Sequence, residues 1–163
     1  MEPRDGDDVL RIYEQGIQTG EATLTSETPS WHEWRNTYLK PFSFVALQGQ
    51  AVVGWAALKM VSTRPVYSGV TDISIYIDEP THRRGVGSTL METIINASEH
   101  AGIWTIRAHM FPENIASVGL HKRFGFREVG ISEKAGKALN GERAGRWSDV
   151  LLMERRSPVA GLD

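Results

Sequence analysis

The sequence has 163 residues, of which 40% are hydrophobic and none is cysteine, and its formal net charge is −2. This length supports one compact domain with a hydrophobic core, and the lack of cysteine excludes disulfides, thiolate metal sites and a cysteine nucleophile. The near-neutral charge gives no reason to expect nucleic acid or an anionic membrane as a partner.

Two helices are predicted in the N-terminal part of the chain. Apolar residues recur at three- and four-residue spacing from Val9 to Ile17, which indicates one buried helix face. The second helix begins at a capping box, in which Ser30 and Glu33 satisfy each other's backbone amides. Its buried stripe is expected to consist of Trp31, Trp34, Tyr38 and Leu39.

From Phe44 onward the pattern becomes that of strands alternating with helices. Strands are predicted at residues 44–47, 51–61, 70–77, 103–110, 126–133 and 147–155. Helices are predicted at 88–101 and 114–124, a glycine-containing loop at 135–145, and a flexible tail at 157–163. This order predicts an α/β sandwich with a mixed sheet, formed by a single domain of residues 1–156.

The sequence shows no sign of export, membrane insertion or metal binding. No apolar run reaches the roughly 18–20 residues that a membrane-spanning helix requires. The first residues (MEPRD) are polar, unlike a signal peptide. The five histidines lack the spacing of zinc ligands. We therefore expect a cytoplasmic protein without a metal.

A glycine-rich turn at residues 81–88 (THRRGVGS) joins a predicted strand to a predicted helix. Gly85 and Gly87 allow the backbone to approach a ligand closely, and amides at a helix start bind anions. The turn is not a Walker A loop, because the Lys-Ser/Thr ending is absent, and Leu90 stands where a dinucleotide fingerprint has its third glycine. The pattern by itself indicates a diphosphate site of another kind, or only a turn.

Several segments in the same order resemble the GNAT-type N-acetyltransferases. Residues 72–77 (DISIYI) with 83–87 (RRGVG) are similar to the acetyl-CoA signature of that superfamily, and residues 112–126 (PENIASVGLHKRFGF) to its second conserved block. Residues 64–67 (RPVY) and 145–150 (GRWSDV) resemble the branch of phosphinothricin and methionine sulfone or sulfoximine N-acetyltransferases. The resemblance extends from about Asp5 to Arg156.

This resemblance implies a GNAT-like fold and acetyl-CoA as co-substrate. Its mixed, mostly antiparallel sheet has helices on both faces, and two strands, here 72–77 and 105–110, splay apart to hold the pantetheine arm. A homodimer is implied by the same analogy. The implied cofactor-binding residues are Ile75, Tyr76, Ile77, Arg83, Arg84, Gly85, Val86, Gly87, Ser88, Asn114 and Ser117.

The resemblance also implies catalytic roles. Asp72, where the family usually has Glu, is the implied base that deprotonates the amine, through a water because Asp is shorter. His121 stands where many relatives have a tyrosine that protonates the departing thiolate, and the alternative is a surface-facing histidine without a proton role. Arg64, Tyr67 and Arg146 are candidates for binding a substrate carboxylate or oxyanion, or are solvated loop residues.

The sequence departs from the family at several positions. His82 replaces the usual Gln or Arg in the glycine-rich turn. Ser68 replaces an Arg that relatives often carry, and this second replacement argues against phosphinothricin itself as the substrate. The family's first strand precedes the region of Asp5, so we expect either that this strand is shortened here or that the sequence begins at an internal Met.

The implied function is acetyl transfer to the primary amine of a small amino-acid-like compound such as phosphinothricin or methionine sulfone or sulfoximine. A protein N-terminus or an antibiotic amine is the alternative substrate. Two alternatives of another class are a module that binds acetyl-CoA without turnover and a nucleotide-binding protein without acyl chemistry.

Overall fold

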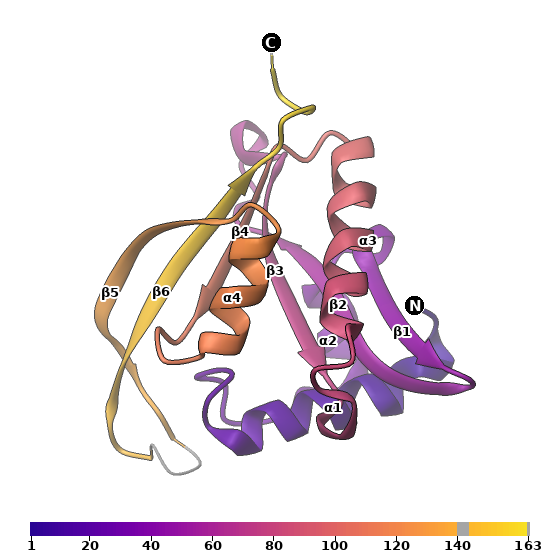
Figure 1. The fold of residues 1–163 in the computed structure, drawn as a ribbon, viewed down its shortest axis with the longest axis vertical. Helices are drawn as coiled ribbons and strands as arrows, with labels where there is room; N and C mark the ends of the chain where they lie inside the picture. The colour runs from indigo at the N-terminus through magenta and orange to yellow at the C-terminus, as the bar shows by residue number, and fades with distance from the viewer. Residues whose placement is uncertain (140–143, 163) are drawn as a thin grey trace.

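The computed structural model describes residues 1–139 and 144–162, which form a six-stranded sheet with helices on both faces (Figure 1). The strand order is β1-β2-β3-β4-β6-β5. The parallel pair is β3 with β4, and the other described neighbours are antiparallel, which confirms the predicted mixed, mostly antiparallel sheet. The strands are β1 (Ser43–Gln48), β2 (Ala51–Met60), β3 (Val70–Ile77), β4 (Thr105–Met110), β5 (Arg127–Lys137) and β6 (Trp147–Arg156).

Four helices cover the two faces: α1 (Gly6–Thr19), α2 (Trp31–Thr37), α3 (Val86–His100) and α4 (Ile115–Arg123). The side-chain alternation of β2 separates the faces, because successive strand residues point to opposite sides. Ala56 and Leu58 belong to the core beneath α3, whereas Trp55 and Ala57 pack against α1 and α2.

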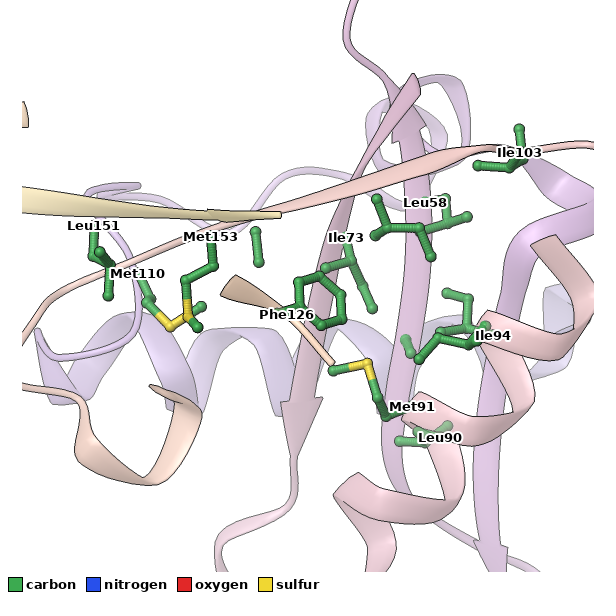
Figure 2. Close-up of a cluster of buried hydrophobic side chains, with 14 residues drawn as sticks. Leu58, Ile73, Leu90, Met91, Ile94, Ile103, Met110, Phe126, Leu151 and Met153 are labelled. Atoms are coloured by element: carbon green, nitrogen blue, oxygen red, sulfur yellow. The ribbon is translucent and has the colours of Figure 1, made fainter. Parts of the chain in front are cut away.

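The larger core lies between the sheet, α3 and α4. Figure 2 shows Leu90, Met91 and Ile94 of α3 directed toward Leu58 and Phe126. These side chains are all nearly inaccessible to solvent. Burial of this stripe supplies the main hydrophobic stabilisation of the fold.

The second core is aromatic. Trp34 and Trp55 are completely buried and meet edge to face, with ring centroids 5.3 Å apart. The predicted capping box is present, since Ser30 Oγ accepts from the Glu33 amide and the Glu33 carboxylate accepts from the Ser30 amide. This cap fixes the start of α2 and so directs its tryptophans onto the sheet.

Two segments differ from the sequence predictions. The region expected to be a loop from residue 135 instead extends β5 to Lys137, because Gly136 and Lys137 pair with Ser148 and Trp147 of β6; Gly141 lies outside the described residues. Before α1 the described chain has a short 3-10 helix (Pro3–Asp5) rather than a shortened strand. In the segment 157–162, where a flexible tail stays a prediction, Ser157 and Ala160 are buried and the other residues are exposed.

The described helices include none that is long and apolar enough to span a bilayer.

Two leucines on adjacent strands test the assignment of the core. Leu58 has 0% exposure and Leu47 has 60%. Leu58→Ala should lower the free energy of unfolding by about 2–5 kcal/mol, because it leaves a cavity in a close-packed core. The matched change Leu47→Ala should cost no more than about 0.5 kcal/mol. Urea denaturation measures both values, and equal losses would contradict the assigned packing.

Candidate active site

The site begins where β3 and β4 separate. In the described chain these strands pair over Val70–Asp72 and Thr105–Arg107 and then diverge (Figure 1). β3 stays paired with β2 as far as Ile77, and β4 stays paired with β6 as far as Met110. Each strand is therefore held on its outer side, while the backbone edges that face each other are free to bind another extended group.

Three adjoining cavities cross this opening. The turn cavity, about 360 Å³, lies between the glycine-rich turn, α3 and α4. The gap cavity, about 120 Å³, lies between the splayed strands and shares Ile75 and Ser117 with the turn cavity. The tyrosine cavity, about 230 Å³, is lined by Tyr13, Tyr38 and Tyr76. It shares Ser74, Tyr76 and His109, among others, with the gap cavity, so the three form a continuous series.

The turn cavity has the features of an anion site. Gly85 adopts a φ of 85°, a left-handed conformation that favours glycine, and directs the chain into α3. Because α3 begins at Val86, two residues before the predicted start, Gly87 and Ser88 lie in its first turn, where backbone amides have no acceptor within the helix. Arg83 lines the same cavity and adds positive charge.

The predicted cofactor-binding residues divide among the cavities. Residues that line the turn cavity are Ile75, Ile77, Arg83, Gly85, Val86, Gly87, Ser88 and Ser117. Arg84 lines a different neighbouring cavity, beside β1. Asn114 lines the gap cavity, and its side-chain oxygen caps α4 by accepting from the Ser117 amide at 3.0 Å. Tyr76 lines the gap and tyrosine cavities, because strand alternation turns it away from the face of Ile75 and Ile77.

His121 is buried in the wall of the gap cavity, with 2% exposure, so it is not a surface-facing histidine. Its Nδ1 lies 2.8 Å from the carbonyl oxygen of Ser117, which can only accept, so we assign the proton to Nδ1. Burial lowers the pKa of His121, and the ring is therefore neutral at pH 7. Nε2 then carries a lone pair and accepts a proton before it can donate one.

Asp72 is the last residue of β3 that pairs with β4, and its side chain is 15% exposed. Its Oδ1 lies 3.4 Å from Arg107 Nε and 3.4 Å from His109 Nε2. Asp72 lines the tyrosine cavity and His121 the gap cavity, whereas His109 lines both. The two predicted catalytic residues thus face adjoining cavities, and His109 lies between them.

The tyrosine cavity is rich in neutral hydroxyl groups. Tyr38 Oη donates to Ser74 Oγ at 3.0 Å, and burial raises the pKa of Tyr38 to about 12. Burial also raises the pKa of Tyr76 well above its ordinary value, and its ring stacks on Trp55 with centroids 4.9 Å apart. These phenols stay protonated at neutral pH and serve as hydrogen-bonding groups.

The predicted substrate-binding residues Arg64, Tyr67 and Arg146 lie elsewhere. All three are exposed and line none of the three cavities. The Arg64 guanidinium instead lies over the Tyr67 ring, 5.7 Å from its centroid. In their place the tyrosine cavity has Lys59 and His109, which sequence reasoning missed because only the strand register brings them beside Asp72.

Comparison with known proteins agrees with this geometry. The profile of the Acetyltransferase (GNAT) family matches residues 8–126, and the chain belongs to this family of N-acetyltransferases. It is 30% identical to a phosphinothricin N-acetyltransferase of Alcaligenes faecalis, over 90% of this chain and 75% of that protein. It is 25% identical to an L-methionine sulfoximine/L-methionine sulfone acetyltransferase of Pseudomonas aeruginosa, over 90% of this chain and 86% of that protein. A GNAT phosphinothricin acetyltransferase from Sinorhizobium meliloti, solved with AcCoA, has a similar fold, with a TM-score of 0.88, 23% identity and coverage of 100% of this chain and 89% of that one.

The buried His121 predicts a pH dependence of stability. Its pKa is lowered by folding, and the unfolded chain restores a value of about 6.5. Below that pH the unfolded state binds the extra proton more readily, so the free energy of unfolding falls as the pH drops through the folded pKa and is fully recovered above about 6.5. His121→Gln should remove this component, measured by urea denaturation between about pH 5.5 and 7.5. The exposed His100, changed to Gln, is the control, and an unaltered slope in His121→Gln would contradict the assignment.

Proposed function

We propose that the protein transfers the acetyl group of acetyl-CoA to the primary amine of a small amino-acid-like compound. The observation that carries this proposal is the continuous series of three cavities. It has an anion-binding turn at one end, a strand gap in the middle and a carboxylate at the other end. The names of the relatives point to phosphinothricin and to methionine sulfone or sulfoximine as compounds of the expected kind.

The described residues fit acetyl-CoA. The amides of the turn and of the first turn of α3, together with Arg83, would hold the diphosphate. The free edge of β3 near Ile75 and Ile77 would hold the pantetheine by strand-like hydrogen bonds. Bound there, acetyl-CoA supplies an activated thioester. A backbone N–H of β3 directed at the developing oxyanion would lower the barrier by roughly 3–4 kcal/mol.

Side chains of the protein would carry out the proton transfers. An alkylammonium has a pKa near about 10 and must lose a proton before its nitrogen can attack. We assign that proton to Asp72, reached through a water or through His109, which contacts it at 3.4 Å. The C–N bond then forms and the C–S bond breaks, and the proton that the acylated nitrogen loses is passed to the departing thiolate. His121 fits this last step only after Nε2 has accepted a proton, because the ring rests in its neutral form.

The size of the tyrosine cavity favours a small substrate over a protein N-terminus. Its volume is about 230 Å³, and residues 22–25 enclose it together with α1. The presence of both Asp72 and His121 supports turnover rather than binding alone. Exposed apolar side chains on β5 and β6, Val129, Ile131 and Trp147, support the expected homodimer.

A thiol-release assay tests the proposed function directly. Acetyl-CoA is offered with a panel of amino acids, their sulfone, sulfoximine and phosphinate analogues, a tripeptide with a free N-terminus and an aminoglycoside. Small amino-acid-like amines should stimulate CoA release most strongly. If acetyl-CoA binds in calorimetry and no amine stimulates release, the protein is a binding module. If ATP or NAD binds as tightly as acetyl-CoA, it is a nucleotide-binding protein.

Two glycines of matched conformation test the anion site. Gly85 and Gly102 have φ values of 85° and 81°, and an added Cβ meets no atom within 4 Å at either position. Alanine at each should cost a similar roughly 1–2 kcal/mol of stability through left-handed strain. Only Gly85→Ala should weaken acetyl-CoA binding, because the strained backbone relaxes by turning the amides of the turn away from the diphosphate. The expected loss of affinity in calorimetry is about tenfold, which corresponds to 1–2 kcal/mol. Unchanged affinity in both variants would remove the turn from the binding site.

Asp72→Asn tests the base. The expected loss of kcat/KM at pH 7 is about 10²-fold or more, which is typical of general-base catalysis. The loss should shrink as the pH approaches the pKa of the amine, because free amine then forms without the base. Asp78→Asn is a matched control, since Asp78 is also 15% exposed and ion-paired, with Arg11 at 2.7 Å. A pH–rate profile of Asp72→Asn that parallels the wild type would exclude Asp72 as the base.

A further inference from the structure

Lys59 is a cation in the wall of the tyrosine cavity that the proposed reaction does not use. It is half-buried near the end of β2. Among the described residues, its ammonium group has no hydrogen-bond or ion-pair partner. A positive charge held in a cavity wall without a partner is a binding group for an anion.

The strand register places Lys59 directly beside Asp72. The two residues are cross-strand partners in the antiparallel pair of β2 and β3, and Asp72 is in turn the partner of Arg107 on β4. Cross-strand partners share one face of the sheet and have Cβ atoms about 4.5–5.5 Å apart. The cavity wall therefore carries a positive and a negative group in adjacent positions, and Arg107 lies on the other side of Asp72, outside the lining.

Asp72 makes its close contacts with residues other than Lys59. Asp72 is the carboxylate of the described lining. Its Oδ1 lies 3.4 Å from Arg107 Nε and 3.4 Å from His109 Nε2, and Arg107 does not itself line the tyrosine cavity. Lys59 is thus without an ion pair among the described residues although it lines the cavity next to Asp72, so it can bind an anionic group that a substrate carries beside its amine.

We propose that Lys59 binds the α-carboxylate of the substrate while the amine lies at Asp72. An α-amino acid carries its ammonium and carboxylate on the same carbon, a separation that suits neighbouring groups on adjacent strands. The substrates are accordingly free α-amino acids and not peptide N-termini, whose α-carboxyl is an amide. This inference rests on the proposed function and narrows its substrate class.

In this proposal Lys59 takes the carboxylate-binding role that the sequence suggested for two exposed arginines. Arg64 and Arg146, which the family resemblance offered as carboxylate-binding residues, line none of the three cavities. Lys59 supplies within the cavity the positive charge that they do not.

The test compares each substrate with an analogue that lacks only the negative charge. L-Methionine sulfone, L-phosphinothricin and other α-amino acids of the panel are offered as free acids and as primary α-amides, next to the tripeptide. The wild type should prefer the free acids by about 10- to 100-fold in kcat/KM, the range expected for a charged hydrogen bond. Lys59→Met should lose most of that preference through a higher KM for the free acid, with the KM of acetyl-CoA unchanged. Lys59→Arg should retain much of it.

The controls separate this inference from the proposed function. Lys40→Met removes an exposed lysine outside the cavity and should keep the wild-type preference. Three outcomes would each overturn the role of Lys59 while leaving the protein an acetyltransferase. They are equal use of acids and amides by the wild type, a preference for acids that survives in Lys59→Met, and highest activity on the tripeptide. If no amine stimulates CoA release although acetyl-CoA binds, the proposed function fails and this inference fails with it.

Discussion

The short contact between β3 and β4 is the constraint on which the site depends. Three residue pairs join these strands, and beyond Asp72 each strand remains bound only to its outer neighbour. The core under α3 and α4 fixes both strands, since Ile73 of β3 and Met110 of β4 pack into it. The gap therefore cannot close by re-pairing without disrupting buried packing. Asp72, as the last paired residue, is held at the point where the gap opens.

Burial gives the two sides of this opening different chemistry. The gap cavity contains a neutral imidazole, because desolvation opposes charge on His121. The tyrosine cavity contains neutral phenols together with Asp72 and Lys59, and Arg107 adjoins Asp72 on the same face of the sheet. Charge is thus concentrated where we place the polar substrate. We place the thioester in the gap cavity, where a fixed backbone donor can face the developing oxyanion.

Local patterns predicted much of this arrangement. The capping box at Ser30, the strand periods and the glycine turn depend on residues close together in the sequence, and the structure has each of them. Which cavity Tyr76 lines, and that Arg64 lines none of the three, were not visible in the sequence for a different reason. Which face a strand residue occupies, and which residue lies opposite, depends on register between segments far apart in the chain. Lys59 next to Asp72 is a product of that register and has no local signature.

The same register gives a physical basis for selectivity. A free α-amino acid offers a cation to Asp72 and an anion to Lys59, so each charged group in the wall gains a partner. A peptide N-terminus offers the cation alone and leaves Lys59 half-buried beside an uncharged amide. Leaving a buried charged group without its partner is more costly than losing an apolar contact, and sites of this kind discriminate strongly. Selection therefore follows from the charge that a wrong substrate fails to satisfy, and the tyrosine cavity needs no tight steric fit to achieve it.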